Sequence, residues 1–245
     1  MFDCAGVTEA LRHFDFARLG PVLDRVETAL ADLECRVVLV TGGPGSGKTS
    51  LLAALADRYP GWGRYFIRPG QDGGLRSFLV AIGTQMARVA PPVEGGAPIT
   101  FTVRTHAEEV AEGGTVTGIR SGEVVSDPFD QRQAIDVEVT TGIVRGRAAG
   151  VVGRFLTAND YPPEALADFA LFHPARRMPG RLAVVLIDGV DRLATGGPDN
   201  DLLRWLSDSE APPANVRFVV AGRGDFGRLR TLREGHRRTL REIEL

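Results

Sequence analysis

Apolar and polar positions in the first part of the chain predict helices and strands in alternation. Residues 22–33, 49–59 and 75–90 each repeat apolar side chains at helical spacing, so we expect three helices there. Short apolar runs at 35–41 and 63–70 predict strands, and the first is apolar enough to be buried on both faces of a sheet. The order strand, helix, strand, helix predicts a parallel α/β sheet.

A different pattern begins at residue 91. From there apolar and polar residues alternate with a period of two, and threonine, valine and glycine are frequent. We therefore expect an antiparallel β insertion over residues 99–152, projecting from the α/β core and without a repeat of solenoid length. The pattern fits a docking surface for a partner and a decorated connection equally well.

The alternation of helices and strands resumes after the insertion. A helical pattern at 162–172 precedes a strand at 181–193, and a helix at 200–209 precedes a strand at 215–225. The last residues, 238–245, alternate well enough to form a further strand. The α/β core therefore has five predicted strands.

Length and composition fit one large domain over residues 1–245, a three-layer α/β core with the β insertion. The chain is 43% apolar and 24% charged, which allows a substantial buried core. No apolar run approaches the roughly 18 residues of a membrane span, and the N-terminus lacks a secretory pattern. Cys4 and Cys35 fit neither a disulfide framework nor a zinc site. We expect a cytoplasmic protein that does not bind membranes.

The charge distribution argues against general nucleic-acid binding. The formal net charge is -2, close to zero for a chain of this length. One locally basic run, REGHRRTLRE at 233–242, is more typical of a solvated helix or loop surface than of a nucleic-acid site. Nucleic acid is therefore not an expected partner.

A glycine-rich loop follows the first predicted strand and carries the only lysine of the chain, Lys48. Its sequence, GGPGSGKT, fits the pattern G-x-x-x-x-G-K-[ST]. Glycines let backbone N–H groups approach phosphate oxygens, and the following helix directs its positive N-terminus at them. The lysine is a compact charge for the β and γ phosphates, and the hydroxyl of Thr49 is a ligand for Mg²⁺. The candidate nucleotide-binding residues are Gly42, Gly43, Pro44, Gly45, Ser46, Gly47, Lys48, Thr49 and Ser50.

Two later strands end in candidate partners for this loop. Asp188 ends the apolar run AVVLID, where a P-loop NTPase needs a carboxylate to hold Mg²⁺. Asp191 follows as a candidate for orienting the attacking water, although a turn or N-cap residue has the same pattern. Arg223 follows the run VRFVVAG and is a candidate for a γ-phosphate contact or for a contact with a neighbour across the cleft, although a surface ion pair has the same pattern. The candidate catalytic residues are Lys48, Asp188, Asp191 and Arg223, and the candidate metal ligands are Thr49 and Asp188.

Three segments together resemble the STAND NTPases, in particular the NACHT-like bacterial signalling ATPases. They are GGPGSGKTS at 42–50, VVLIDGVDRL at 184–193 and RWLSDSEAPPANVRFVVAGRGD at 204–225. The resemblance covers about residues 35–90 and 156–245 and implies a P-loop fold with strand order 5-1-4-3-2. It also implies ATP or ADP and Mg²⁺ as ligands, and a switch that oligomerises or engages protein partners when a signal is sensed, often in defence.

Two features differ from the pattern of that family. Arg192 stands where many members have a glutamate, and the usual Gly-Arg entry motif before the first helix is not evident. Both differences count against efficient hydrolysis and the family's adenine contacts, so we expect a slow Mg-dependent ATPase. The resemblance assigns the Walker A positions to Gly42, Gly47, Lys48 and Thr49, the Walker B carboxylate to Asp188, the second acidic position to Asp191 and the sensor arginine to Arg223.

Other functions also fit the sequence. A nucleotide-binding scaffold would hold ATP or ADP as a structural switch with negligible turnover. A small-molecule kinase fits the chain length but would need an arginine-rich lid over an acceptor pocket, which is not evident. A GTPase is disfavoured because its guanine-reading motif Asn-Lys-x-Asp needs a second lysine.

Overall fold

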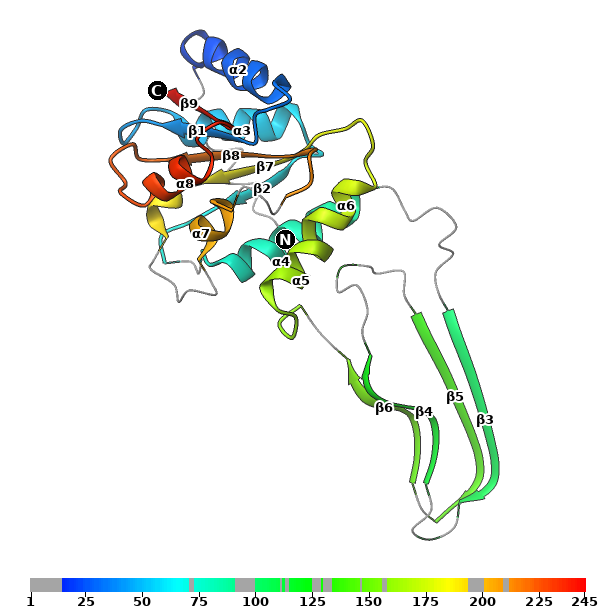
Figure 1. Ribbon diagram of the computed structural model, residues 1–245. Helices are drawn as coiled ribbons and strands as arrows, with labels where there is room; N and C mark the ends of the chain where they lie inside the picture. The colour runs from blue at the N-terminus through cyan, green and yellow to red at the C-terminus, as the bar shows by residue number, and fades with distance from the viewer. Residues whose placement is uncertain are drawn as a thin grey trace. The chain divides into compact units, whose positions relative to one another are not determined.

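The computed structural model describes residues 15–70, 73–90, 100–110, 112, 115–124, 129, 134–145, 147–155, 158–193, 201–208 and 212–245. The chain divides into two compact units (Figure 1). Met1–Ala90 and Pro163–Leu245 form the first unit, and Pro91–Pro162 forms the second. Residue 99, where the insertion was expected to begin, lies outside the described residues.

The first unit is built on a five-stranded parallel sheet, as the sequence predicts. Neighbouring strands follow the order β2-β7-β8-β1-β9. Every residue of β1, β7 and β8 is buried, because helices cover both faces of these central strands (Figure 1). The strands are β1 (Val37–Thr41), β2 (Gly63–Phe66), β7 (Ala183–Asp188), β8 (Val216–Gly222) and β9 (Leu240–Glu244).

Helices α2 (Phe16–Ala31) and α3 (Lys48–Arg58) cover one face of this sheet. Their apolar side chains form one core cluster with alternate residues of β1, β7 and β8. Helix α2 begins earlier than the predicted 22–33, because the Asp15 side chain caps it by accepting a hydrogen bond from the Arg18 N–H at 3.2 Å. The core thus holds α3 against the sheet.

The opposite face is covered by helices packed around Trp205. Its ring stacks on Phe172 at 6.1 Å, meets Phe218 of β8 edge-on at 6.0 Å and lies 5.8 Å from Phe78, measured between ring centroids. The predicted helix at 162–172 is the start of a longer helical run that includes a π-helical turn. The elements are α4 (Leu75–Val89), α5 (Pro163–Ala167), the π-helix η1 (Asp168–Phe172), α6 (His173–Arg176), α7 (Leu202–Leu206) and α8 (Leu229–Gly235).

The second unit contains four strands, and the antiparallel pairing expected for 99–152 is wrong. Strand β3 pairs with β5 in parallel, and β4 pairs with β6 in parallel, in two separate sheets. The chain leaves β3, passes through β4 in the other sheet and returns to β5, which provides the crossover that a parallel pair needs. The strands are β3 (Thr100–Val110), β4 (Thr115–Val124), β5 (Ala134–Val144) and β6 (Arg147–Phe155).

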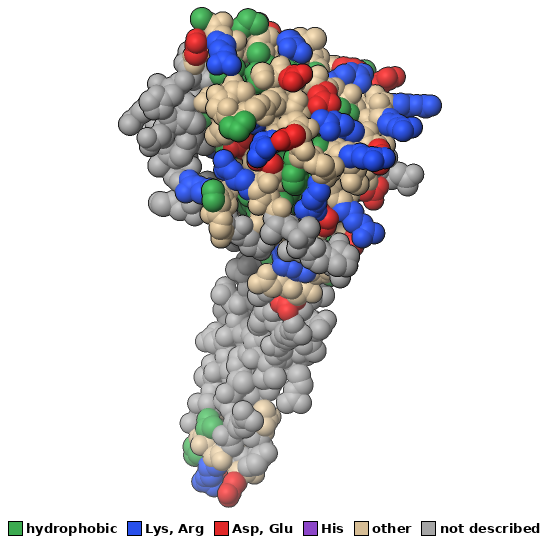
Figure 2. Space-filling model, turned by 90° about the vertical axis from the view of Figure 1, so that its left-hand side faces the viewer, with side chains coloured by type: hydrophobic (Ala, Val, Ile, Leu, Met, Phe, Trp, Pro, Cys, Tyr) green, Lys and Arg blue, Asp and Glu red, His purple; other side chains and the backbone are tan. Residues whose placement is uncertain are grey.

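Charged side chains of both signs are interspersed on the first unit. Figure 2 shows Lys and Arg beside Asp and Glu across the described part of one face. In the basic run at 233–242, Arg233 pairs with Glu242 at 2.7 Å and Arg241 pairs with Asp32. The run therefore presents less free positive charge than its sequence implies. Within the described residues, no helix is long and apolar enough to cross a membrane.

Candidate functional site

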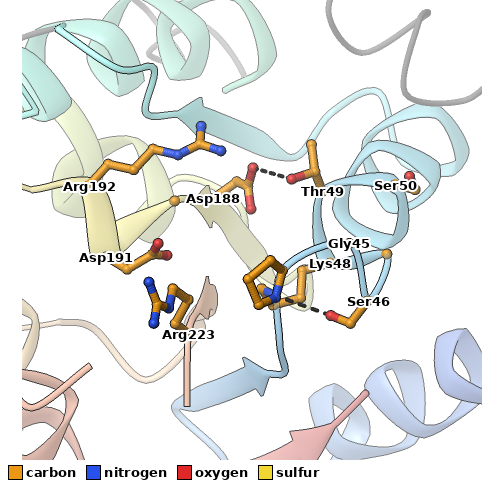
Figure 3. A pocket seen from close by; sticks show the side chains of 12 residues that line it. Gly45, Ser46, Lys48, Thr49, Ser50, Asp188, Asp191, Arg192 and Arg223 are labelled. Atoms are coloured by element: carbon orange, nitrogen blue, oxygen red, sulfur yellow. Dashed lines mark hydrogen bonds between the residues drawn. The ribbon is translucent and has the colours of Figure 1, made fainter. Parts of the chain in front are cut away.

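The candidate residues meet at the carboxyl edge of the parallel sheet. The glycine loop follows β1, Asp188 is the last residue of β7, and Arg223 follows β8. Together they line a cavity of about 350 Å³ (Figure 3). In open α/β sheets, ligands bind outside the carboxyl ends of the strands. The lining residues are Pro44, Gly45, Ser46, Gly47, Lys48, Thr49, Ser50, Asp188, Gly189, Asp191, Arg192 and Arg223.

The loop ends in a glycine whose backbone only a glycine adopts readily. Gly47 has φ 100°, in the left-handed region, and it occupies the N-cap position of α3 without a side chain to cap the helix. The first N–H groups of an α-helix have no partner within the helix, and here no capping side chain takes them. The N-terminus of α3 is therefore free to bind an anion with backbone donors and the positive end of the helix dipole.

Lys48 is held by the loop that it follows. Its ammonium group donates hydrogen bonds to the carbonyl oxygens of Gly42 and Gly43, both at 2.8 Å, and to Ser46 Oγ at 3.2 Å. Gly42 and Gly43 do not line the cavity themselves, so their part in the site is to position this lysine. Burial lowers the pKa of Lys48, while the nearby carboxylates of Asp191 and Asp188 oppose that shift. A phosphate bound there would offset the cost of this desolvation by supplying negative charge.

A hydrogen bond joins α3, the helix after the glycine loop, to β7. In the sheet, β8 lies between β7 and β1. Thr49 Oγ1 donates to Asp188 Oδ2 at 2.8 Å (Figure 3). Asp188 is only 4% exposed, and burial raises the pKa of its carboxyl, with the Thr49 hydrogen bond opposing the shift. A buried carboxylate beside a hydroxyl is a fitting pair of ligands for a hard cation such as Mg²⁺.

The described residues contain no cluster of three or more His, Cys, Asp or Glu side chains arranged to hold a metal ion. Magnesium is commonly bound by one or two carboxylates, with water and substrate phosphates as the other ligands. The pair formed by Thr49 and Asp188 therefore fits a magnesium ion that arrives with a phosphate compound, rather than one held by the protein alone.

A glycine turn brings Asp191 and Arg192 to the cavity. Gly189 has φ 78°, and a Cβ there would lie 2.9 Å from the carbonyl oxygen of Ile67. The turn leads into the 3-10 helix η2 (Val190–Arg192). Arg192 Nη1 then donates to the Ile67 carbonyl oxygen at 2.9 Å. In the sequence Arg192 stands out only as a difference from the family pattern, whereas in the structure its side chain lines the cavity.

Arg223 lies at the cavity, as expected, but it also has a carboxylate partner of its own. Its Nε and Nη2 donate to the two carboxylate oxygens of Asp225 at 3.1 and 2.6 Å. This ion pair lowers the pKa of the Asp225 carboxyl and raises that of Arg223. The expected surface ion pair is therefore present, and the same side chain also lines the cavity. The motif GRGD, in which Asp225 follows Arg223 by two residues, was the available signal for this pair.

The sequence matches no family model and no curated protein. The site's geometry is therefore the basis for assigning a function. Its wall formed by residues 44–50 offers backbone donors and an ammonium group, and its wall formed by residues 188–192 offers two carboxylates and a guanidinium. Such a combination suits a phosphorylated ligand that is accompanied by a divalent cation.

Proposed function

We propose that the first unit binds ATP and ADP with Mg²⁺ at the carboxyl edge of its sheet and hydrolyses ATP slowly. The observation that carries the proposal is the hydrogen bond at 2.8 Å between Thr49 and Asp188, beside Lys48. It brings together a phosphate-binding loop and a strand-end carboxylate from positions far apart in the sequence. The sheet order, with β8 between β1 and β7, supports the P-loop NTPase fold that the resemblance implies.

Each group has a distinct part in this proposal. The N-terminus of α3 binds the phosphate oxygens, and Thr49 and Asp188 hold the cation. The Lys48 ammonium, whose three donors are taken by the loop in the structure, exchanges at least one of those bonds for a phosphate oxygen. Bound there, Mg²⁺ would neutralise charge on the phosphates. Asp191, which lines the same cavity, orients the attacking water. The wider role, a STAND-type bacterial signalling or defence switch acting through protein partners or self-association in the cytoplasm, follows from the resemblance and is part of the proposal.

A nucleotide-binding scaffold with negligible turnover is the second candidate. The observation that favours it is the ion pair between Arg223 and Asp225. The resemblance assigns Arg223 to the reaction as the sensor arginine, but in the structure its guanidinium donates two hydrogen bonds to the Asp225 carboxylate. Phosphate release measured on purified protein with excess Mg²⁺ and ATP separates the two functions. Release at the uncatalysed rate, with nucleotide bound, would favour the scaffold.

Binding is tested by titrating ATP in the presence of Mg²⁺ into the parent and into Lys48→Ala. We expect the variant to lose binding while it keeps its fold, because Lys48 is half-buried and its three acceptors belong to a largely exposed loop. Arg230→Ala is the matched control, since Arg230 carries the same charge, is exposed and pairs with Glu234 away from the cavity. Unchanged affinity in Lys48→Ala would refute the proposed site.

A further inference from the structure

Cationic side chains outnumber carboxylates among the described residues that line the cavity. Lys48, Arg192 and Arg223 line it, against Asp188 and Asp191. Lys48 belongs to the loop wall, which leaves two guanidinium groups on the facing wall. The hydrogen bonds of these two groups show which of them is available to a ligand.

Among the described residues, Arg223 has a carboxylate partner and Arg192 has none. Both carboxylate oxygens of Asp225 accept from Arg223. The hydrogen bond that the structure records for Arg192 among the described residues is a single one, to the carbonyl oxygen of Ile67. A guanidinium has five N–H donors, so this bond uses only one of the donors of Arg192.

The side chain of Arg192 is exposed, but two contacts place its guanidinium. The Cδ of Arg192 would be 3.4 Å from a Cβ on Gly189, so its stem runs close along the glycine turn. The hydrogen bond to Ile67 then anchors the head at the end of β2. Figure 3 shows the group on the Asp188 side of the cavity, whereas Arg223 lies beside Asp191. An arginine held in this way loses little side-chain freedom on binding a ligand.

We propose that Arg192 is a ligand of the terminal phosphate and makes this site prefer ATP to ADP. The inference rests on the proposed function and deepens it. The loop wall and α3 hold the phosphates common to both nucleotides, and Arg192 offers its donors from the facing wall, where the additional phosphate of ATP adds charge. Charge-assisted hydrogen bonds from arginine to phosphate are among the stronger polar contacts in proteins.

The test compares the affinities for ATP and ADP by calorimetric titration with excess Mg²⁺. In the parent we expect ATP to bind more tightly than ADP. Arg192→Gln removes the charge, and we expect it to weaken ATP binding by about tenfold or more and ADP binding by less than about twofold. Arg192→Lys keeps the charge without the fork and should lie between the parent and Arg192→Gln.

Matched controls separate the possible outcomes. Arg230→Gln makes the same change on an exposed helix position outside the cavity and should alter neither affinity. Equal losses for both nucleotides in Arg192→Gln, or no preference in the parent, would overturn the inference. So would loss of the ATP preference in Arg223→Gln with Arg192→Gln unaffected. If the folded parent binds neither nucleotide, the proposed function itself fails, and that result is distinct from these. Should Arg192→Gln not fold, as judged by thermal unfolding, Arg192→Lys alone still decides. A ratio of ATP to ADP affinity equal to that of the parent would refute the proposal, because a lysine does not replace the fork of the arginine.

Discussion

The change Asp188→Asn should stabilise the protein without ligand and impair its proposed function. Asp188 is 4% exposed, and its hydrogen-bond partner is the hydroxyl of Thr49, which donates to an amide oxygen as well as to a carboxylate. The substitution therefore keeps shape and hydrogen bond and removes a buried charge. Removing such a charge relieves a desolvation cost, so we expect a gain in the free energy of unfolding at pH 7.

The sign follows from proton binding. Burial raises the pKa of the Asp188 carboxyl above its ordinary value of 3.8, so the folded protein binds this proton more tightly than the unfolded chain. The contribution of this group to stability is therefore full below pH 3.8 and is lost as the pH rises through the raised folded pKa. Asp188→Asn should lack this loss. A recovery of about 1 kcal/mol, typical of single substitutions, raises Tm by about 2–4 °C in a domain of this size.

The assay is thermal unfolding in EDTA over a pH series from about 4 to 8, followed by the same measurement with Mg²⁺ and ATP. Asp57→Asn makes the same chemical change at an exposed position of α3 and should shift the stability by less than about 0.5 kcal/mol. Saturating ATP together with Mg²⁺ should raise the Tm of the parent. In Asp188→Asn, ATP with Mg²⁺ should raise Tm by no more than ATP alone does. A variant that is no more stable than the parent near pH 7, or that follows the same pH dependence, would refute the reasoning from burial.

Three further changes test other parts of the molecule. Asp191→Asn should keep ATP affinity and lower phosphate release by about 10²-fold, because Asp191 lines the cavity without being placed as a metal ligand, and release at the parent rate would exclude it as the water-orienting group. Gly189→Ala should lower the free energy of unfolding by more than Gly180→Ala, as measured by denaturant unfolding of the two variants. Both glycines have positive φ (78° and 71°), but only at Gly189 would a Cβ meet a backbone atom. Replacing residues 91–162 by a glycine-serine linker should leave ATP affinity unchanged, because the described residues that line the cavity all belong to the first unit. A folded deletion variant that no longer binds would contradict this.

The core strands were predictable because burial on both faces leaves a strong signal in the sequence. Strands β1 and β7 are unbroken apolar runs, and each is followed by residues that serve as turns or polar ends. The glycine loop likewise carries its backbone requirement in its composition, so Gly47 and Lys48 could be placed from sequence. Asp188 was predictable because a carboxylate that ends an apolar strand must lie at the edge of the sheet.

The strand pairing of the second unit could not be read from the same kind of pattern. An alternation with a period of two identifies a strand and its two faces, but it does not name the partner strand or its direction. The short connection between β3 and β4 fits a hairpin as well as a crossing from one sheet to another. The choice between them depends on how β3 and β5 meet across a long separation in the chain, and local sequence carries little of that information.

The partners of the arginines at the site were also hidden, for a different reason. Arg192 binds a backbone carbonyl of residue 67, and any residue type there would offer the same oxygen. A pattern of side chains cannot reveal such a contact. The pair of Arg223 with Asp225 is local, and the spacing of two residues makes it predictable. The family pattern assigns the arginine to the phosphate and does not include the carboxylate that follows it.

The position of Lys48 also gives the protein a chemical label. The chain has one ε-amine, and it lies in the cavity with three hydrogen-bond acceptors around it. Because burial lowers the pKa of this amine, a larger share of it is in the neutral, nucleophilic form than for an ordinary exposed lysine. An amine-directed acylating reagent would therefore report, by intact mass, on a single side chain besides the terminal amine. The rate at which that one mass increment accumulates, with and without a bound ligand, measures the occupancy of the site without any mutation.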